Sequence, residues 1–263
     1  MTDATAERAE LAPAIRDALA ALLLSLADDE FVIGFWDSEW TGIAPMLEED
    51  VATSSISQDE IGHARALYEM LAELTGTDAD AIAFGREPEA YRHAALLNHP
   101  RTDWAFTVAR RYLYETADSV RLEALARSAF EPLAQLATKM RREERYHVMH
   151  LDAWLKRLAE DSGEARRRLE EALERLWTDA MAIFTPLAGE QDLIAAGILP
   201  EPMATLRSRW LDGVRATFAA LHLPVPNDLS TPASDGRTRR TDDFRWLHGQ
   251  FTMVARSDEG ATW

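Results

Sequence analysis

The chain is dominated by segments in which apolar residues recur every three or four positions, the period of an amphipathic α-helix. Alternating runs of β-branched residues, which indicate strands, are rare. The pattern therefore predicts an all-α protein that forms one domain over residues 1–263. We expect helices over residues 13–36, 45–74, 78–84, 102–129, 132–159, 163–184, 190–198, 202–221 and 242–254.

Four of these helices are long enough to form a core bundle, about residues 13–159. The long connection 77–100 suits the crossover between two helical hairpins. Peripheral helices follow over about 163–222, then a loop rich in Pro, Ser, Thr and Asp over about 224–241, and a C-terminal helix and tail over 242–263.

Single residues mark the expected helix ends. Gly76 is a suitable C-terminal glycine, Asp103 a suitable N-cap, and Pro132 fits the first turn of a helix. Gly34 is expected to interrupt the first helix.

Two Glu-x-x-His pairs lie inside these helical patterns, Glu60 with His63 and Glu144 with His147. Side chains three positions apart lie on the same face of a helix, so each pair can hold one metal ion between a carboxylate and an imidazole. Bundles that bind two metal ions combine two such pairs with one Glu from each of the other two helices.

The two missing carboxylates follow from the geometry of a hairpin, because ligands at one height are placed symmetrically about the turn. Glu30 pairs in this way with Glu60 about a midpoint at Pro45. Glu115 pairs with Glu144 about a midpoint just before Pro132. Proline at both midpoints supports the assignment, because it interrupts a helix.

A single Glu-x-x-His pair in a chain with 28% charged residues is more often part of a solvated helix face than a metal site. These pairs differ, because they are in phase with the apolar stripes of their helices, which include Leu67 and Leu71 in one case and Leu151 and Trp154 in the other. Buried carboxylates are costly unless they are paired or bound to metal. The expected ligand set is Glu30, Glu60, His63, Glu115, Glu144 and His147.

Composition narrows the function. A formal net charge of −17 argues against binding to nucleic acid and to anionic membranes, both of which require basic surfaces. The chain has no cysteine, which excludes disulfides, iron–sulfur clusters and a thiol nucleophile. The apolar run 18–24 is too short to span a bilayer and lacks a basic leader, so we expect a cytoplasmic protein.

Several motifs resemble the PaaC-type subunits of the bacterial phenylacetyl-coenzyme A ring epoxidase. They are Asp28-Asp29-Glu30, the segments 37–45 and 58–64, Glu143-Glu144-Arg145-Tyr146-His147, and the final Trp263. The resemblance runs nearly from end to end. It implies a ferritin-like four-helix bundle with additional C-terminal helices.

The resemblance also implies partners. In that family a related catalytic protein, PaaA, uses a di-iron centre and O₂ to epoxidise the aromatic ring of phenylacetyl-CoA. The PaaC-type subunit pairs with it and with a second copy of itself, and is usually structural, often with several ligands lost. This chain departs from that pattern, because all six ligand positions are filled.

Carboxylates with one imidazole per metal suit iron or manganese. Asp59 and Asp118 are candidates for orienting the two imidazoles, although both can equally be ordinary polar neighbours. The coenzyme A site is not located by the sequence. Its candidate arginines are Arg110, Arg111, Arg141, Arg142 and Arg166 to Arg168, and each can also be a plain surface residue.

Three function classes remain. We favour a subunit of the multicomponent epoxidase, which acts in aerobic phenylacetate degradation. A di-iron oxygenase that acts by itself ranks second, because the ligand set is intact. Iron storage ranks last, since it requires a shell of many copies and the chain continues well beyond the bundle.

Overall fold

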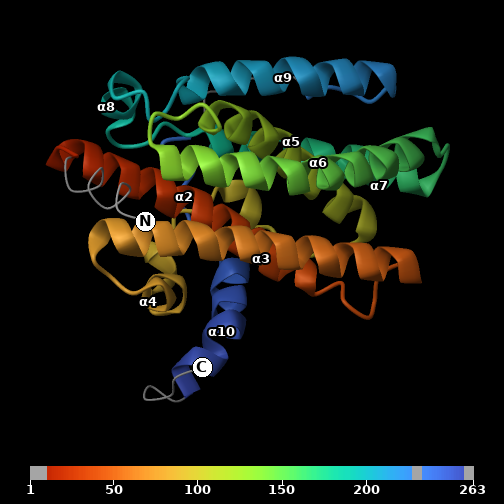
Figure 1. Cartoon of the computed structure of the whole chain (residues 1–263). Helices are drawn as coiled ribbons and strands as arrows, with labels where there is room; N and C mark the ends of the chain where they lie inside the picture. The colour runs from red at the N-terminus through yellow and green to blue at the C-terminus, as the bar shows by residue number, and fades with distance from the viewer. Residues whose placement is uncertain (1–10, 227–232, 258–263) are drawn as a thin grey trace. The chain divides into compact units, whose positions relative to one another are not determined.

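The computed structural model describes residues 11–226 and 233–257. These ranges consist of helices and connecting loops and contain no strand, so the predicted all-α class is confirmed. Figure 1 shows the labelled helices and the loops that connect them. By its internal contacts the chain divides into two compact units. One, here called unit 1, comprises residues 1–22 and 102–236, and the other, unit 2, comprises residues 23–101 and 237–263. The boundary falls inside helix α2, and the expectation of one domain stays a prediction.

Unit 2 contains one of the two expected hairpins. It is formed by α2 (Pro13–Ser38) from Leu23 onward and by α3 (Leu47–Thr75). Gly76, with φ of 71°, ends α3 in the left-handed conformation as expected. The Asp78 carboxylate caps α4 (Ala79–Phe84) by accepting from the Ala81 amide. The 3₁₀ turns η1 (Pro88–Ala90) and η2 (Ala95–Asn98) follow, and α10 (Asp242–Ser257) contacts α4 and η1.

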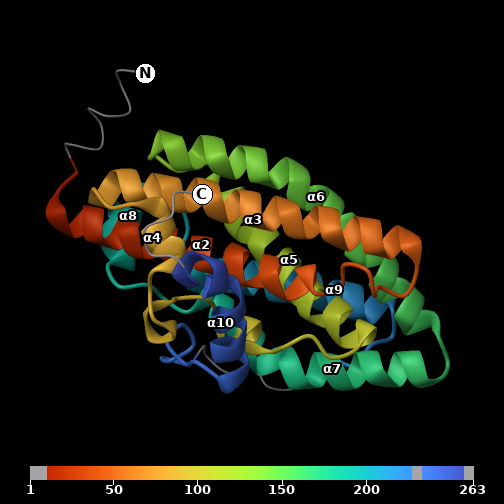
Figure 2. The same ribbon diagram turned by 90° about the horizontal axis from the view of Figure 1, so that it is seen from below.

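Unit 1 contains the second hairpin, formed by α5 (Trp104–Leu125) and α6 (Glu131–Glu160). Asp103 caps α5 as predicted, and Pro132 lies in the first turn of α6. The remaining elements are α7 (Glu164–Ala180), η3 (Met181–Phe184), α8 (Glu190–Ala195) and α9 (Met203–Ala220). Helix α5 packs against α6, α7 and α9, which surround it (Figure 2). It is consequently buried on nearly every side.

One expected helix break is absent, and one helix ends well before its expected end. Helix α2 continues through Gly34 without the expected break. Helix α5 ends at Leu125 and not near Ala129, because the chain turns there to bond residues 197 and 198. The Ala129 amide donates to the Gly197 carbonyl, and the Ser128 hydroxyl donates to the Ile198 carbonyl.

The described residues 224–226 and 233–240 are irregular as predicted, with turns at residues 234–238. Two of its arginines, Arg237 and Arg240, are nevertheless buried. The terminal Trp263 lies outside the described residues. None of the helices in the described part of the chain combines the length and apolar composition that a membrane crossing needs.

Candidate metal centre

The α2–α3 hairpin of unit 2 brings together Glu30, Glu60 and His63, here called the unit 2 triad. The Nδ1 atom of His63 lies 3.3 Å from Oε2 of Glu30 and 3.9 Å from Oε2 of Glu60. All three side chains are buried, with exposed fractions of 3% or less. Each offers one ligand atom, and these atoms lie within 4.8 Å of one another.

Gly34 permits the close approach of α2 and α3 at the level of this triad. A Cβ atom at position 34 would lie 3.0 Å from the Cβ of Glu60 and 3.0 Å from the Cδ1 of Ile61. Contacts that short require the neighbouring helix to move. The glycine that was expected to break the helix therefore acts as a contact point next to a candidate ligand.

The α5–α6 hairpin of unit 1 repeats the arrangement with Glu115, Glu144 and His147, here called the unit 1 triad. The Nδ1 atom of His147 lies 3.7 Å from Oε2 of Glu115 and 3.4 Å from Oε2 of Glu144. These side chains are also buried, and their ligand atoms again lie within 4.8 Å of one another. Each predicted Glu and His ligand is thus buried, and within each unit the predicted three meet.

Glu115 has a charged partner that the sequence analysis placed elsewhere. The Arg111 guanidinium, one helical turn earlier on α5, forms a buried ion pair with the Glu115 carboxylate. Burial alone would raise the pKa of Glu115, but the charge of Arg111, with the neighbouring Glu144 and His147, outweighs it and holds that pKa well below its ordinary value. The i, i+4 spacing of 111 and 115 was the available signal.

Two further carboxylates, Asp28 and Asp29, directly precede Glu30 and are fully buried. Asp28 accepts from the Tyr68 hydroxyl at 2.6 Å and pairs with Arg86 at 2.5 Å. Asp29 accepts from the Ala94 amide at 2.7 Å and forms a two-pronged ion pair with Arg237 at 3.1 and 3.0 Å. Their charges are therefore compensated within unit 2.

These contacts join α2 to the segment that precedes α10. Besides Asp29, Arg237 donates to the Arg92 carbonyl at 2.9 Å, and Arg240 donates to the Tyr91 carbonyl at 2.5 Å. Burial lowers the pKa of Arg240 to about 10. The burial of these arginines could not be predicted, because the composition of their segment is typical of an exposed loop.

The two proposed imidazole-orienting residues have different surroundings. Asp118 is buried and forms an ion pair with Arg121, with Nη2 to Oδ1 at 2.5 Å and Nε to Oδ1 at 2.9 Å. That partner was not foreseen. Asp59 is half-buried on α3. An orienting role for either stays a prediction.

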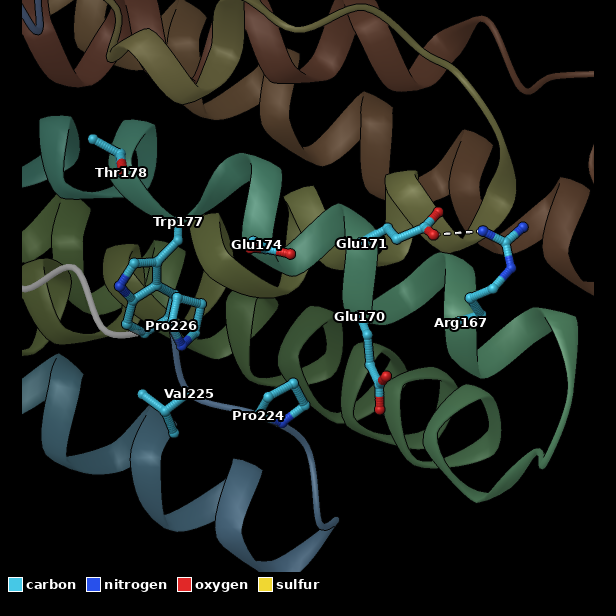
Figure 3. A pocket seen from close by; sticks show the side chains of 9 residues that line it. All are labelled: Arg167, Glu170, Glu171, Glu174, Trp177, Thr178, Pro224, Val225 and Pro226. Carbon is cyan, nitrogen blue, oxygen red and sulfur yellow. Dashed lines mark hydrogen bonds and ion pairs between the residues drawn. The ribbon is translucent and has the colours of Figure 1, made fainter.

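The arginine candidates for coenzyme A separate into three groups. Arg110 and Arg111 are buried. Arg166, Arg167 and Arg168 each pair with a glutamate on α7. Arg167, Glu170, Glu171 and Glu174 line a neighbouring hollow of about 610 Å³ together with Pro224 and Pro226. Figure 3 shows that Glu171 points toward Arg167, with which it is paired. Three carboxylates disfavour a phosphate group there. Arg141 and Arg142 remain exposed on α6.

The two triads can be assessed chemically as metal ligands. Each supplies carboxylate oxygens and one imidazole nitrogen, a donor set that suits iron, manganese or other divalent first-row ions. Burial adds to the cost of leaving the carboxylates ionised without a cation nearby. These buried groups of glutamate and histidine could bind a metal.

Paired helical hairpins that each carry Glu and Glu-x-x-His define the class of ferritin-like carboxylate proteins. Comparison with known proteins identifies the family. The chain belongs to the family of phenylacetic acid catabolic proteins, which it matches over residues 1–263.

Two relatives from Escherichia coli (strain K12) are similar to the chain, and both are components of 1,2-phenylacetyl-CoA epoxidase. One is the C-type component of that epoxidase, which is 28% identical over 246 residues, covering 93% of this chain and 99% of the relative. The other is the A-type component, which is 27% identical over 218 residues, covering 81% of this chain and 70% of the relative. The resemblance to this family stated from the motifs is thus confirmed.

Proposed function

We propose that this protein is a subunit of a multicomponent phenylacetyl-CoA 1,2-epoxidase and acts in aerobic phenylacetate degradation. The observation that carries the proposal is the match to the C-type component over nearly the full length of both chains. The complex, with phenylacetyl-CoA as its substrate, contains a catalytic partner of the A type. This chain pairs with that A-type partner and with a second copy of itself.

The proposal includes a metal site of the chain's own. Glu30, Glu60 and His63 would hold one ion and Glu115, Glu144 and His147 the other. The support is that both triads are buried and offer the same donor set. Iron or manganese in such a site supplies redox chemistry with O₂. The chain's residues bind the ions, and the apolar helix faces around them exclude water.

Arg111 supplies the positive charge that compensates a carboxylate of the unit 1 triad. Its guanidinium neutralises Glu115 when no cation is bound. Binding of a metal ion to Glu115 then requires the guanidinium to turn away or to share the carboxylate. The affinity of the site for metal is therefore expected to be lower than that of a site without such a competitor.

Reconstitution tests the function. The purified chain should form a stable complex with the A-type partner from the same organism, measured by size-exclusion chromatography with light scattering. Epoxidation of phenylacetyl-CoA by the A-type partner, supplied with its reductant, should rise when this chain is added. A chain that neither binds that partner nor changes its turnover would contradict the proposal.

A second candidate is a di-iron oxygenase that acts without a catalytic partner. It is favoured by the complete set of six ligand residues. The iron-loaded chain alone should then oxidise an aromatic thioester, and the Glu60→Gln variant should not. Absence of turnover by the iron-loaded chain, together with turnover by the reconstituted complex, would leave the proposal of an epoxidase component.

A further inference from the structure

Three arginines of α6, namely Arg141, Arg142 and Arg145, form an exposed positive cluster. With Thr138 and Tyr146 they line a shallow hollow of about 440 Å³. Two large apolar side chains lie on the same face, Tyr146 with 67% and Met149 with 63% of its surface exposed. We call residues 138, 141, 142, 145, 146 and 149 the arginine stripe.

The arginine stripe is exceptional because its charges have no partner. Within residues 11–226 and 233–257, none of the side chains of its three arginines has a hydrogen bond, ion pair or ring contact with another described residue. Every other arginine in those ranges has at least one. In a chain with a net charge of −17, carboxylate partners are abundant, so three neighbouring arginines without one need a reason.

In the isolated chain the like charges of the stripe lower the stability of α6. Arg141 and Arg145 are four positions apart, Arg142 and Arg145 are three apart, and Lys139 lies three before Arg142. Like charges at these spacings repel one another along a helix. The positions at i−4 and i+4 from Arg142 are Thr138 and Tyr146, which bring no compensating charge.

The stripe lies on the face of α6 opposite the unit 1 triad. With 100° between successive residues, positions 142, 145 and 149 point away from the buried positions 144, 147 and 151. The arginines therefore take no part in holding a metal. They are available to a molecule that approaches α6 from outside.

The composition of the stripe fits a protein surface better than a small anion. Arginine and tyrosine are the residues most enriched where binding energy is concentrated in protein interfaces, and methionine adds adaptable apolar contact. All residues of the hollow come from one helix, so no second element closes over a small ligand. An acidic face with apolar residues complements both the charge and the apolar surface.

We propose that the arginine stripe is the surface through which this chain binds an acidic, partly apolar helix face of its A-type partner. The inference rests on the proposed function. It adds which face of this chain makes the contact and which chemistry the partner must present. Carboxylates of the partner pair with Arg142 and Arg145, and apolar residues of the partner cover Tyr146 and Met149.

The test compares two double variants of the full chain in titrations with the A-type partner. Arg142→Gln with Arg145→Gln should raise the dissociation constant at least about tenfold. The control is Arg65→Gln with Lys156→Gln, which makes the same change in charge at side chains that are 80% and 63% exposed but already paired. The control should change the dissociation constant less than about twofold. Added salt should weaken the parent complex more than the complex of the arginine variant.

The variant should fold, because removing like charges relieves repulsion on an exposed helix, and circular dichroism checks this. If the parent binds the A-type partner and both double variants bind it equally well, the stripe is not the contact surface and only this inference fails. A variant that loses self-association but still binds the A-type partner would assign the stripe to a second copy and overturn the inference. Failure of the parent to bind would overturn the proposed function as well.

Discussion

At the scale of single residues, the candidate centre depends on how buried charges are balanced. Arg111 and Glu115 form one ion pair on α5, and Arg121 and Asp118 form another on the same helix. Both arginines are nearly inaccessible to solvent, with exposed fractions of 3% and 1%. Only the first pair includes a candidate metal ligand, so the two pairs make a matched comparison.

Replacing Arg111 by Gln should leave Glu115 without its cation. Loss of one partner of a buried pair costs about 3–5 kcal/mol, so the metal-free variant should unfold at lower denaturant concentration. Added Mn²⁺ should recover more stability in this variant than in the parent, because the ion no longer competes with a guanidinium. Denaturant titrations with and without Mn²⁺ measure both effects.

The Arg121→Gln variant is the control for this comparison. It should lose a similar amount of stability, because Asp118 is left buried without its cation. Its response to Mn²⁺ should match that of the parent. Equal responses to Mn²⁺ in the parent, the Arg111 variant and the Arg121 variant would show that Arg111 does not compete with metal.

The pKa of Glu115 also predicts a pH dependence. Its pKa in the folded state lies well below the ordinary value of 4.5, so below about pH 4.5 the unfolded state binds the proton more readily. The stability that Glu115 contributes is present above pH 4.5 and is lost as the pH falls through the folded pKa. The metal-free parent should therefore lose stability below pH 4.5 more steeply than Glu115→Gln, measured by urea unfolding. Parallel pH profiles would contradict the assignment.

At the scale of elements, most helices could be predicted because their signals are local. The apolar stripe, the Asp103 cap and Gly76 fix α5 and α3 to within a few residues of the expected ends, with the C-terminus of α5 as the exception. That end depends on bonds to residues 197 and 198, which no local pattern encodes. The ligand residues could be predicted because a carboxylate within the apolar stripe of a helix is buried, and a buried carboxylate needs a cation.

The partners of the buried acids were harder to predict, because they also depend on contacts between distant parts of the chain. Asp29 pairs with Arg237, which is 208 positions away in a segment whose composition is typical of a loop. Arg111 was near in sequence, but its role depends on α5 being surrounded by other helices. Long-range pairing and burial of a whole helix are properties of the folded chain, which a one-helix pattern cannot contain.

Gly34 and Gly62 allow a test of how α2 and α3 pack. A Cβ atom at Gly62 meets nothing within 4 Å, so Gly62→Ala should stabilise the protein by about 0.5–1 kcal/mol through helix propensity alone. At Gly34 the same change forces Glu60 and Ile61 away, and overpacking costs about 1–3 kcal/mol. Gly34→Ala should therefore be destabilising, and it should weaken the response to Mn²⁺. Equal stabilisation by both changes in thermal unfolding would show that the contact is not restrictive.

The segment before α10 can be tested through its arginines. Arg237→Gln leaves Asp29 buried without its cation and should cost about 3–5 kcal/mol. Arg245→Gln breaks only exposed ion pairs, with Glu89 and Asp242, and should cost about 1 kcal/mol or less. Urea unfolding of the two variants measures the difference. Similar small losses would mean that the Arg237 pair contributes no more than a surface contact.

At the scale of the whole molecule, the two triads fall in different compact units. Each unit therefore contains a complete Glu, Glu and His set. If each triad binds an ion, as we propose, then metal should stabilise both units. A site confined to either unit would stabilise that unit alone. The two possibilities differ in which residues must be removed to abolish the effect of metal.

Fe²⁺ under anaerobic conditions, or Mn²⁺, should raise the melting temperature of the parent, because the ion binds the folded state and not the unfolded one. A free ion concentration one hundred times the dissociation constant should stabilise the folded state by about 2.7 kcal/mol.

Glu60→Gln with Glu144→Gln should abolish this shift and leave the metal-free fold intact or more stable, since two buried carboxylates are removed. Glu60→Gln alone should abolish the part of the shift that the unit 2 triad contributes and keep the part that the unit 1 triad contributes. Hydrogen exchange resolved by segment completes the test: protection by metal should appear in both α3 and α6 of the parent. The same metal-induced shift in the double variant and the parent would show that these six residues are not the binding site.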